Sequence, residues 1–273
     1  MTLAEIFPDA DYQFRIRFER HPPGDFFQPT RDHAALLAER QRWLQAEPTR
    51  YGALLPEGVP LLDETLAFAA SQGIPPGDLP LVAASCDPKS RCLALGMAWE
   101  PDFLLLRVEP GAAVRLVGGC VCFPSSWSLE EKLGKPIEFI HETVPGLNAS
   151  IGGQIHSFLV KLRPGIAWER SNWGLSRSPD LNQHPTRRLA GLDETIRLEE
   201  VWLRIEHQAL LALPASQGVL FGIRLQVQPL SEVRADNALT PRLARALRTM
   251  PEDVARYKGL NTARAKLIEL LQG

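Results

Sequence analysis

The stretch "RLEEVWLRIEHQALLALP" (residues 197–214) is the longest run of alternating side chains in the chain. Such alternation predicts a β-strand with two unlike faces, because successive side chains of a strand point to opposite sides of the sheet. One face carries Val201, Leu203, Ile205 and His207, and the other carries Trp202, Arg204, Glu206 and Gln208. A second strand-like segment, "GVLFGIRLQVQPL" (218–230), follows after a short turn. The two segments therefore predict an antiparallel hairpin.

Three further segments have strand character: "DFLLLRVE" (102–109), "VRLVGGCVCF" (114–123) and "IAWERSNWGLS" (166–176). The first two predict a hairpin that turns at Pro110-Gly111. Helical spacing occurs at 31–46, 61–71, 80–95 and 148–162, and again from 240 onward. In "SLEEKLG" (128–134), Ser128 and Glu131 have the spacing of a capping box. We therefore expect an α+β fold, with a five-stranded antiparallel sheet covered by helices over one face.

The same pattern suggests a division of the chain into three parts. Residues 1–100 are expected to form a mainly helical region packed on the core, residues 101–232 the core itself, and residues 233–273 a helical extension. "DYQFRIRFER" (11–20) alternates and is a further strand candidate within the first part.

Charge and composition exclude several classes of function. Thirty basic and thirty-two acidic residues give a net charge of −2, which favours neither nucleic acid nor an anionic membrane as a partner. The sequence contains no apolar run of about eighteen residues and no leader pattern at its N-terminus, so we expect a cytoplasmic protein. Four cysteines, at 86, 92, 120 and 122, lack C-x-x-C spacing. They indicate reduced structural thiols, with a metal or redox role as the alternative.

Three residues are candidates for chemistry. His141, in "EFIHETVPG", has apolar neighbours and is either a satisfied core histidine or an axial ligand to haem iron. Arg170, in "WERSNWG", could bind a carboxylate with both guanidinium arms or form a structural ion pair. Glu206 could be the partner in that pair, or could hold a substrate cation or relay protons. His207 is expected to be a satisfied core residue, and no serine occupies a G-x-S-x-G hydrolase motif.

These segments resemble a known family. "CFPSSWSLEEKLGKPIEFIHETVPG" (122–146), "RSNW" (170–173) and "LRIEHQALLALPASQGVLFGIR" (203–224) are similar to the catalytic α-subunit family of haem-dependent oxidative N-demethylases, over roughly residues 102–230. The resemblance implies a PAS-like domain that encloses haem b. It also implies oxidative removal of a methyl group from a small secondary amine such as dimethylamine, with O2 as oxidant and formaldehyde as product. In this family the electrons come ultimately from NAD(P)H through separate flavin and iron–sulfur partners.

The resemblance also assigns residues. His141 matches the family's "IH-x-x-VP" motif and is implied to bind the iron, and Arg170, Asn172 and Trp173 match its "R-x-NW" segment in the haem pocket. Trp127 is implied to lie in one wall of the pocket. Glu206 and Gln208 match the family's "ERQ", with His207 in place of the arginine, and Glu206 is implied to orient the amine.

Two other functions fit the same residues. One is a non-catalytic, haem-binding PAS-like sensor or subunit, and the other is a scaffold without cofactor. The chain lacks a dinucleotide fingerprint and a ferredoxin-like cysteine set, so catalysis would require a partner reductase.

Overall fold

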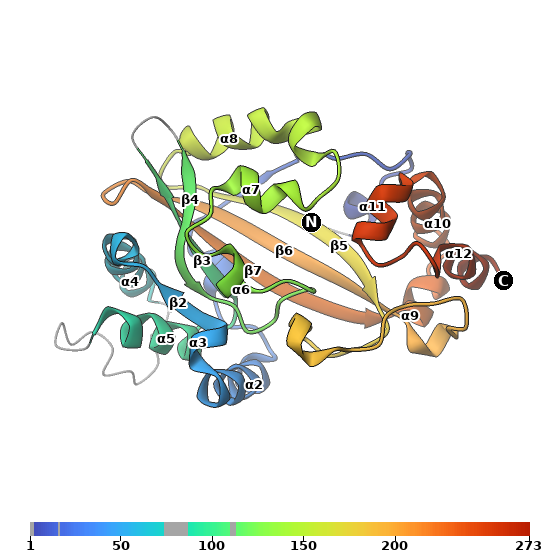
Figure 1. Ribbon diagram of the computed structural model, residues 1–273, viewed down its shortest axis with the longest axis horizontal. Helices are drawn as coiled ribbons and strands as arrows, with labels where there is room; N and C mark the ends of the chain where they lie inside the picture. Colours follow the sequence, from blue (N-terminus) through green and yellow to red (C-terminus); the bar gives the residue numbers. More distant parts are fainter. Residues whose placement is uncertain (1–2, 16, 74–86, 110–112) are drawn as a thin grey trace.

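The structure, a computed structural model, describes residues 3–15, 17–73, 87–109 and 113–273. Its centre is an antiparallel sheet of seven strands in the order β1-β5-β6-β7-β3-β4-β2 (Figure 1). All five predicted strands are present: β3 Asp102–Val108, β4 Val114–Cys120, β5 Ala167–Ser176, β6 Trp202–Leu213 and β7 Gly218–Pro229. They are contiguous in the sheet, in the order β5-β6-β7-β3-β4. The α+β class is confirmed.

The sheet has seven strands rather than the five that were predicted. Two three-residue strands, β1 (Glu19–His21) and β2 (Gly52–Leu54), extend the sheet at its two edges. β1 is the last part of the strand candidate at 11–20, most of which is not strand. Strands this short carry almost no alternation, so they join the sheet through tertiary pairing with β5 and β4.

The predicted hairpin of β6 and β7 forms the centre of the sheet. The two strands pair over their full length, from Trp202 opposite Pro229 to Leu213 opposite Gly218. β3 and β4 also pair antiparallel as predicted, and the Pro110-Gly111 turn between them lies outside the described residues.

Most predicted helices are present. The helices of the structure are α1 Leu3–Ile6, α2 His33–Ala46, α3 Pro48–Tyr51, α4 Val59–Ser71, α5 Pro88–Ala98, α6 Leu129–Lys132, α7 Ile137–Glu142, α8 Gly153–Val160, α9 Leu230–Ala235, α10 Thr240–Thr249, α11 Glu252–Tyr257 and α12 Arg264–Gln272. A π-helical turn at Asn148–Gly152 leads into α8. Residues 80–86 of the helix predicted at 80–95 lie outside the described residues. The capping box is wrong, because the Ser128 side chain makes no capping hydrogen bond and its hydroxyl is buried.

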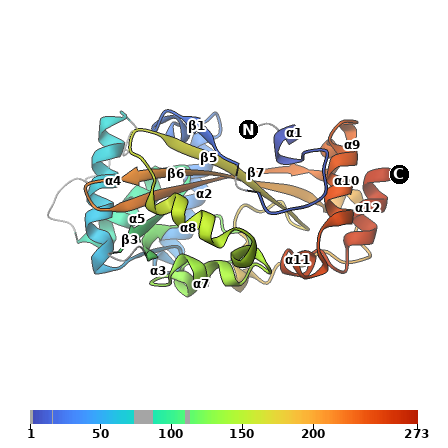
Figure 2. The ribbon, with the colours of Figure 1, turned by 90° about the horizontal axis from the view of Figure 1, so that it is seen from above.

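Helices cover both faces of the sheet rather than one. α6, α7 and α8 lie on one face, which we call the α7 face, and pack there on Leu104, Leu210 and Val219. The opposite face packs on α2, α4 and α5 at one end, and on α9, α10 and α12 at the other, where α11 lies on the α7 side (Figure 2). The run "ALLAL" in β6 explains the difference, since Leu210 and Leu211 are both buried on opposite faces. An apolar run of this kind needs cover on both sides.

The N-terminal helices share one hydrophobic cluster with β3, β4, β6 and β7. The division into three parts stays a prediction. The thiols of Cys92, Cys120 and Cys122 are free and buried, with 4.0 Å between the last two sulfur atoms. No helix within the described ranges has the length and apolar character to span a bilayer.

Candidate functional site

The strands β5 and β6 form the floor of the candidate site. Arg170 lies opposite Gln208, and Asn172 lies opposite Glu206. Side chains of paired residues in a sheet point to the same face, so these four polar groups share the α7 face. Of the four, Asn172 is exposed and the other three are partly buried. The predicted alternation of "WERSNWG" is confirmed.

His141 lies on α7, the helix that covers this floor. Burial, together with the nearby cations Arg170 and Lys132, lowers its pKa to about 4, against the opposing effect of Glu138. The imidazole is therefore neutral at physiological pH. It forms no hydrogen bond to any residue that the structure describes. The expectation of a core histidine satisfied by backbone is thus not met, and both ring nitrogens are left available.

Arg170 is a partly buried cation without a direct partner among the described residues. Burial lowers the pKa of its guanidinium, while Glu206 and Tyr12 act in the opposite direction. Within the described part of the chain, no carboxylate lies within 4.0 Å of it and no hydrogen bond to the guanidinium is formed. Glu206 influences Arg170 from a distance but does not form the structural ion pair that the sequence left open. An arginine in this state can bind an incoming anion.

A helix from the C-terminal part of the chain contributes two more groups. Lys258, directly after α11, donates from Nζ to the Trp173 carbonyl at 2.7 Å and lies 5.2 Å from the centre of the Trp173 ring. Burial, with a smaller contribution from Arg170, lowers its pKa to about 8 against the opposing effect of Glu206. Tyr257 is 49% exposed, and its pKa is raised by partial burial and by the neighbouring Glu206. Both groups therefore lie within electrostatic reach of Glu206.

Tyr12 completes the group from the N-terminal side. Burial and Tyr257 raise its pKa to about 12, against the opposing effect of Arg170. Both tyrosine hydroxyls are therefore protonated near neutral pH and can donate hydrogen bonds.

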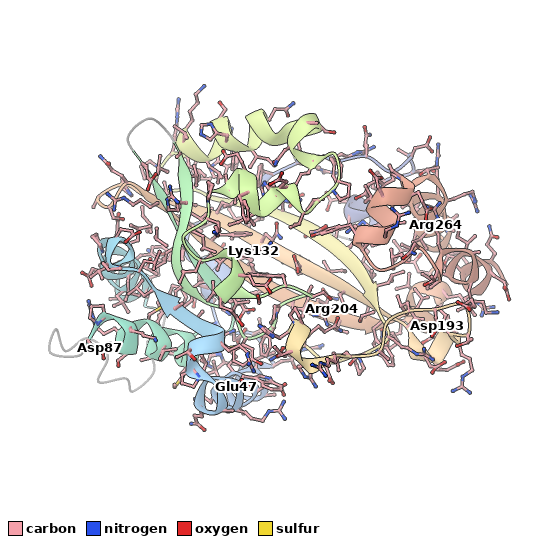
Figure 3. The ribbon with its side chains drawn as sticks, in the orientation of Figure 1. Glu47, Asp87, Lys132, Asp193, Arg204 and Arg264 are labelled. Carbon is pink, nitrogen blue, oxygen red and sulfur yellow. The ribbon has the colours of Figure 1, made fainter. Side chains whose placement is uncertain are left out.

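Arg204, on the same face of β6, has a structural role. Its guanidinium donates to the carbonyls of Asp180 and Leu181 at 2.7 and 2.9 Å, in the loop that follows β5 (Figure 3). It also donates to the Ser125 hydroxyl at 3.3 Å, and burial lowers its pKa to about 10. Arg204 thus ties the loop before α6 to the loop after β5, and both loops border the floor.

The structure separates two predicted residues from the rest. The Trp173 side chain points to the opposite face and packs against Phe7, with ring centres 5.0 Å apart. His207 also faces away, where its ring nitrogens are 3.0 Å from the Ser171 hydroxyl and 3.2 Å from the Gln226 amide. His207 has partners at both ring nitrogens, as expected, but it is partly buried rather than in the core. Its replacement of the family's arginine does not alter the face that carries Glu206. Trp127 is on the α7 face, where it packs with the apolar cluster.

Sequence reasoning missed Tyr12, Tyr257 and Lys258. Tyr12 is in an irregular segment that was expected to be strand, so its alternation was misleading. "RYKG" (256–259) ends a helix, where basic residues are common because they interact favourably with the final carbonyl groups. Only the tertiary fold brings these groups to Glu206.

The donor set fits haem. A haem iron requires one or two axial ligands from protein, since the macrocycle supplies the others, and a neutral, unbonded imidazole meets that need. The propionates of haem require cations, and Arg170 is one without a carboxylate partner. No residue of α7 is fully buried, and Ile137 and Ile140 pack on the cluster below it. In the described ranges, no cluster of three or more His, Cys, Asp and Glu side chains could hold a metal ion.

Comparison with protein families gives an independent result. Residues 77–268 match a family described as haem-dependent oxidative N-demethylase, alpha subunit-like. The match spans β3 to β7 and most of the C-terminal helices, and so contains every group of the site except Tyr12.

Proposed function

Because the chain belongs to the haem-dependent oxidative N-demethylase, alpha subunit-like family, we propose that it binds haem b on the α7 face and demethylates a small secondary amine. The substrate class is dimethylamine-like. The reaction consumes O2, two electrons and two protons, and releases formaldehyde, water and the demethylated amine. The family name supports haem dependence and oxidative N-demethylation, whereas the substrate class and the products are our proposal.

The observation that carries the proposal is the state of His141. Its low pKa keeps the imidazole neutral, and none of the described residues occupies its ring nitrogens. A ligand to iron must offer an unprotonated nitrogen, and a histidine that is only structural usually forms hydrogen bonds when it is partly buried. We assign His141 as the protein ligand to the iron.

The remaining residues of the face have complementary roles in the proposal. Arg170 binds a propionate, Asn172 lines the haem pocket, and Trp127 provides an apolar wall. Glu206 supplies the negative charge that orients a cationic amine. Haem supplies the oxidative chemistry with O2, and Arg204 keeps the bordering loops in place.

Electrons would come from outside the chain. The sequence has no dinucleotide fingerprint or ferredoxin-like cysteine set, and the family is named for an alpha subunit. We propose that separate flavin and iron–sulfur partners carry electrons from NAD(P)H.

A haem titration monitored by absorption spectroscopy tests whether His141 binds the iron. The wild-type protein and the variants H141A and H207A are titrated with haem, and H207A is the control because His207 lies on the opposite face. We expect a normal Soret band in wild type and H207A, and a shifted or absent band in H141A that added imidazole restores. Identical spectra for all three proteins would exclude His141 as the ligand, and a wild type that takes up no haem would exclude the proposed function.

Formaldehyde release tests catalysis. The haem-loaded protein is supplied with dimethylamine, O2 and a flavin reductase with a ferredoxin. Release of formaldehyde that requires the amine, O2 and both electron-transfer proteins would support the proposed catalytic activity. Haem binding without formaldehyde, over a panel of secondary amines, supports the non-catalytic haem-binding module instead.

A further inference from the structure

An open groove of about 750 Å³ lies between α8, the segment that leads into β5, and β1 at the edge of the sheet (Figure 2). Its floor is apolar and includes Phe158, Leu162 and Trp168. The rings of Phe158 and Trp168 are 5.5 Å apart and nearly perpendicular, and Phe18 stacks on Phe158 with ring centres 4.2 Å apart. The floor is therefore a packed aromatic surface, and it lies outside the group around Glu206.

Three cations border this floor. Arg20, Lys161 and Arg163 are exposed, and the Arg20 guanidinium lies 4.7 Å from the centre of the Trp168 ring. No carboxylate of a described residue lies within 4.0 Å of any of the three, and none of the residues that line the groove is acidic. The whole chain has a net charge of −2, so this positive cluster does not follow from composition. Such a cluster attracts an anionic partner.

The groove is too open for a small ligand. Five of its ten lining residues are exposed, including all three cations, whereas small-molecule sites bury most of the surface of their ligand. Val160, one turn after the lining residue Ser157 on α8, is 37% exposed and extends the apolar surface. An apolar centre with a polar, charged rim is typical of protein–protein interfaces. The groove therefore fits the surface of a partner protein.

The groove lies on the α7 face, at one end of the floor of the candidate site. Trp168 precedes Arg170 by two residues on β5, so both side chains are on this face, with roughly 7 Å between their Cα atoms. Glu19 and Glu169, which are paired between β1 and β5, point to the other face and do not line the groove. A protein that docks in the groove would thus lie beside the haem pocket of the proposed function.

We propose that this groove docks an acidic face of the iron–sulfur protein that supplies electrons. The proposal rests on the proposed function for the identity of the partner, whereas the negative charge of the partner follows from Arg20, Lys161 and Arg163. Carboxylates of the partner would pair with these cations, and an apolar side chain at the centre of its face would cover Phe158 and Trp168. Charges at the rim of an interface mainly set the association rate and its dependence on salt, so these are the quantities to measure.

The double variant K161Q/R163Q tests the docking surface, with an acidic [2Fe–2S] ferredoxin as the probe. Both residues are exposed, and Arg20 is left in place because it packs on Trp168. K89Q is the matched control, since Lys89 is an exposed lysine on α5, which covers the opposite face. At low salt the ferredoxin should associate roughly tenfold more slowly with K161Q/R163Q than with wild type or K89Q. The difference should vanish at about 1 M salt, and K161R/R163K, which keeps both charges, should resemble wild type.

Two comparisons separate this proposal from the proposed function. If wild type binds no haem, but the apo-protein associates with the ferredoxin at a rate that depends on Lys161 and Arg163, the docking surface stands and the proposed function falls. If haem is bound, but the ferredoxin associates equally fast with wild type and K161Q/R163Q or with neither, the docking surface is overturned and haem binding stands. Dithionite, a small reductant, should reduce the haem of both proteins at the same rate. Slower reduction of the double variant by dithionite would place the defect in the haem pocket and overturn the proposal.

Flavin mononucleotide tests a small planar anion as the occupant of the groove. We expect no saturable binding to the apo-protein, because the groove is open. If the nucleotide binds wild type but not K161Q/R163Q, and the ferredoxin associates with both proteins at the same rate, the groove is a ligand site and the proposal is overturned.

Discussion

Two regions of this molecule enclose arginine side chains and treat them in opposite ways. Arg40, on α2, is fully buried and every arm of its guanidinium has a partner. It is 2.5 Å from the Asp102 carboxylate and 2.7 Å from the Gly96 carbonyl, and its last nitrogen is 3.6 Å from Cys120 Sγ. Arg170 is partly buried, yet no described residue forms an ion pair or hydrogen bond with its guanidinium.

The contrast separates a structural use of charge from a functional one. Asp102 accepts hydrogen bonds from the amides of Cys122 and Phe123, so the partners of the buried pair with Arg40 are all supplied by the protein. Such a pair fixes β3 against the segment after β4 and against α2. Arg170 and Lys258, the cations near Glu206, form no ion pair with a described residue, and we expect them to contribute little to the stability of the fold. We therefore expect substitutions at the first region to affect stability, and those at the second to affect ligands.

The largest effect is expected for R40M. It removes the counter-ion of Asp102 and leaves a buried carboxylate uncompensated, which costs about 3–5 kcal/mol. Urea denaturation measures the free energy of unfolding, and the double variant R40M/D102N should recover part of the loss because no charge then remains unpaired. A loss below about 1 kcal/mol in R40M would mean that the pair does not hold the two regions together.

A smaller loss is expected for R204M. Its three acceptors are two carbonyl groups and one hydroxyl, so the variant leaves neutral groups unsatisfied rather than a buried charge. We expect a loss of about 2 kcal/mol in the free energy of unfolding. Limited proteolysis should then cut the loop at 177–187, and R188M, at an exposed position, is the control. Protection of this loop equal to that of wild type would contradict its proposed attachment by Arg204.

Much of the fold was predictable, because its longest strands carry strong local patterns. β6 alternates over its first half, and the five predicted strands are all present. The two edge strands have three residues each and could not be recognised from pattern. Coverage of both faces was missed since alternation in the first half of β6 suggested one solvated face, whereas "ALLAL" in its second half is apolar on both.

The site was predictable only where its residues share a strand. Alternation placed Arg170 and Asn172 together, and register then placed Asn172 opposite Glu206. The contribution of Tyr12 and Lys258 could not be foreseen, because they are separated by more than 240 residues and only the tertiary fold brings them near Arg170. The Trp173 side chain lies on the opposite face from Arg170 and Asn172, although the family motif had suggested that all three share the haem pocket.

A gain in stability is expected for K258M at neutral pH. Burial depresses the pKa of Lys258 from 10.5 to about 8, so the folded state binds fewer protons than the unfolded state between these values. The penalty for charging Lys258 is therefore complete below pH 8 and disappears as the pH rises to about 10.5. The apo-variant should be more stable than wild type at pH 7, and this gain should shrink as the pH rises from about 8 to about 10.5. Destabilisation at pH 7 would show that Lys258 stabilises the fold.

The smallest effect on stability is expected for R170M, and it makes the sharpest contrast with R40M. Removal of an unpaired cation breaks no ion pair, although it withdraws a favourable interaction with Glu206. The two effects oppose each other, so the free energy of unfolding of the apo-protein should change by no more than about 0.5 kcal/mol. Haem affinity should nevertheless fall roughly tenfold, because a propionate would lose its guanidinium partner. A matched pair of measurements, urea denaturation and Soret titration, therefore distinguishes the two arginines. If R170M is as unstable as R40M, the two regions do not differ in kind, and Arg170 belongs to the framework rather than to a binding site.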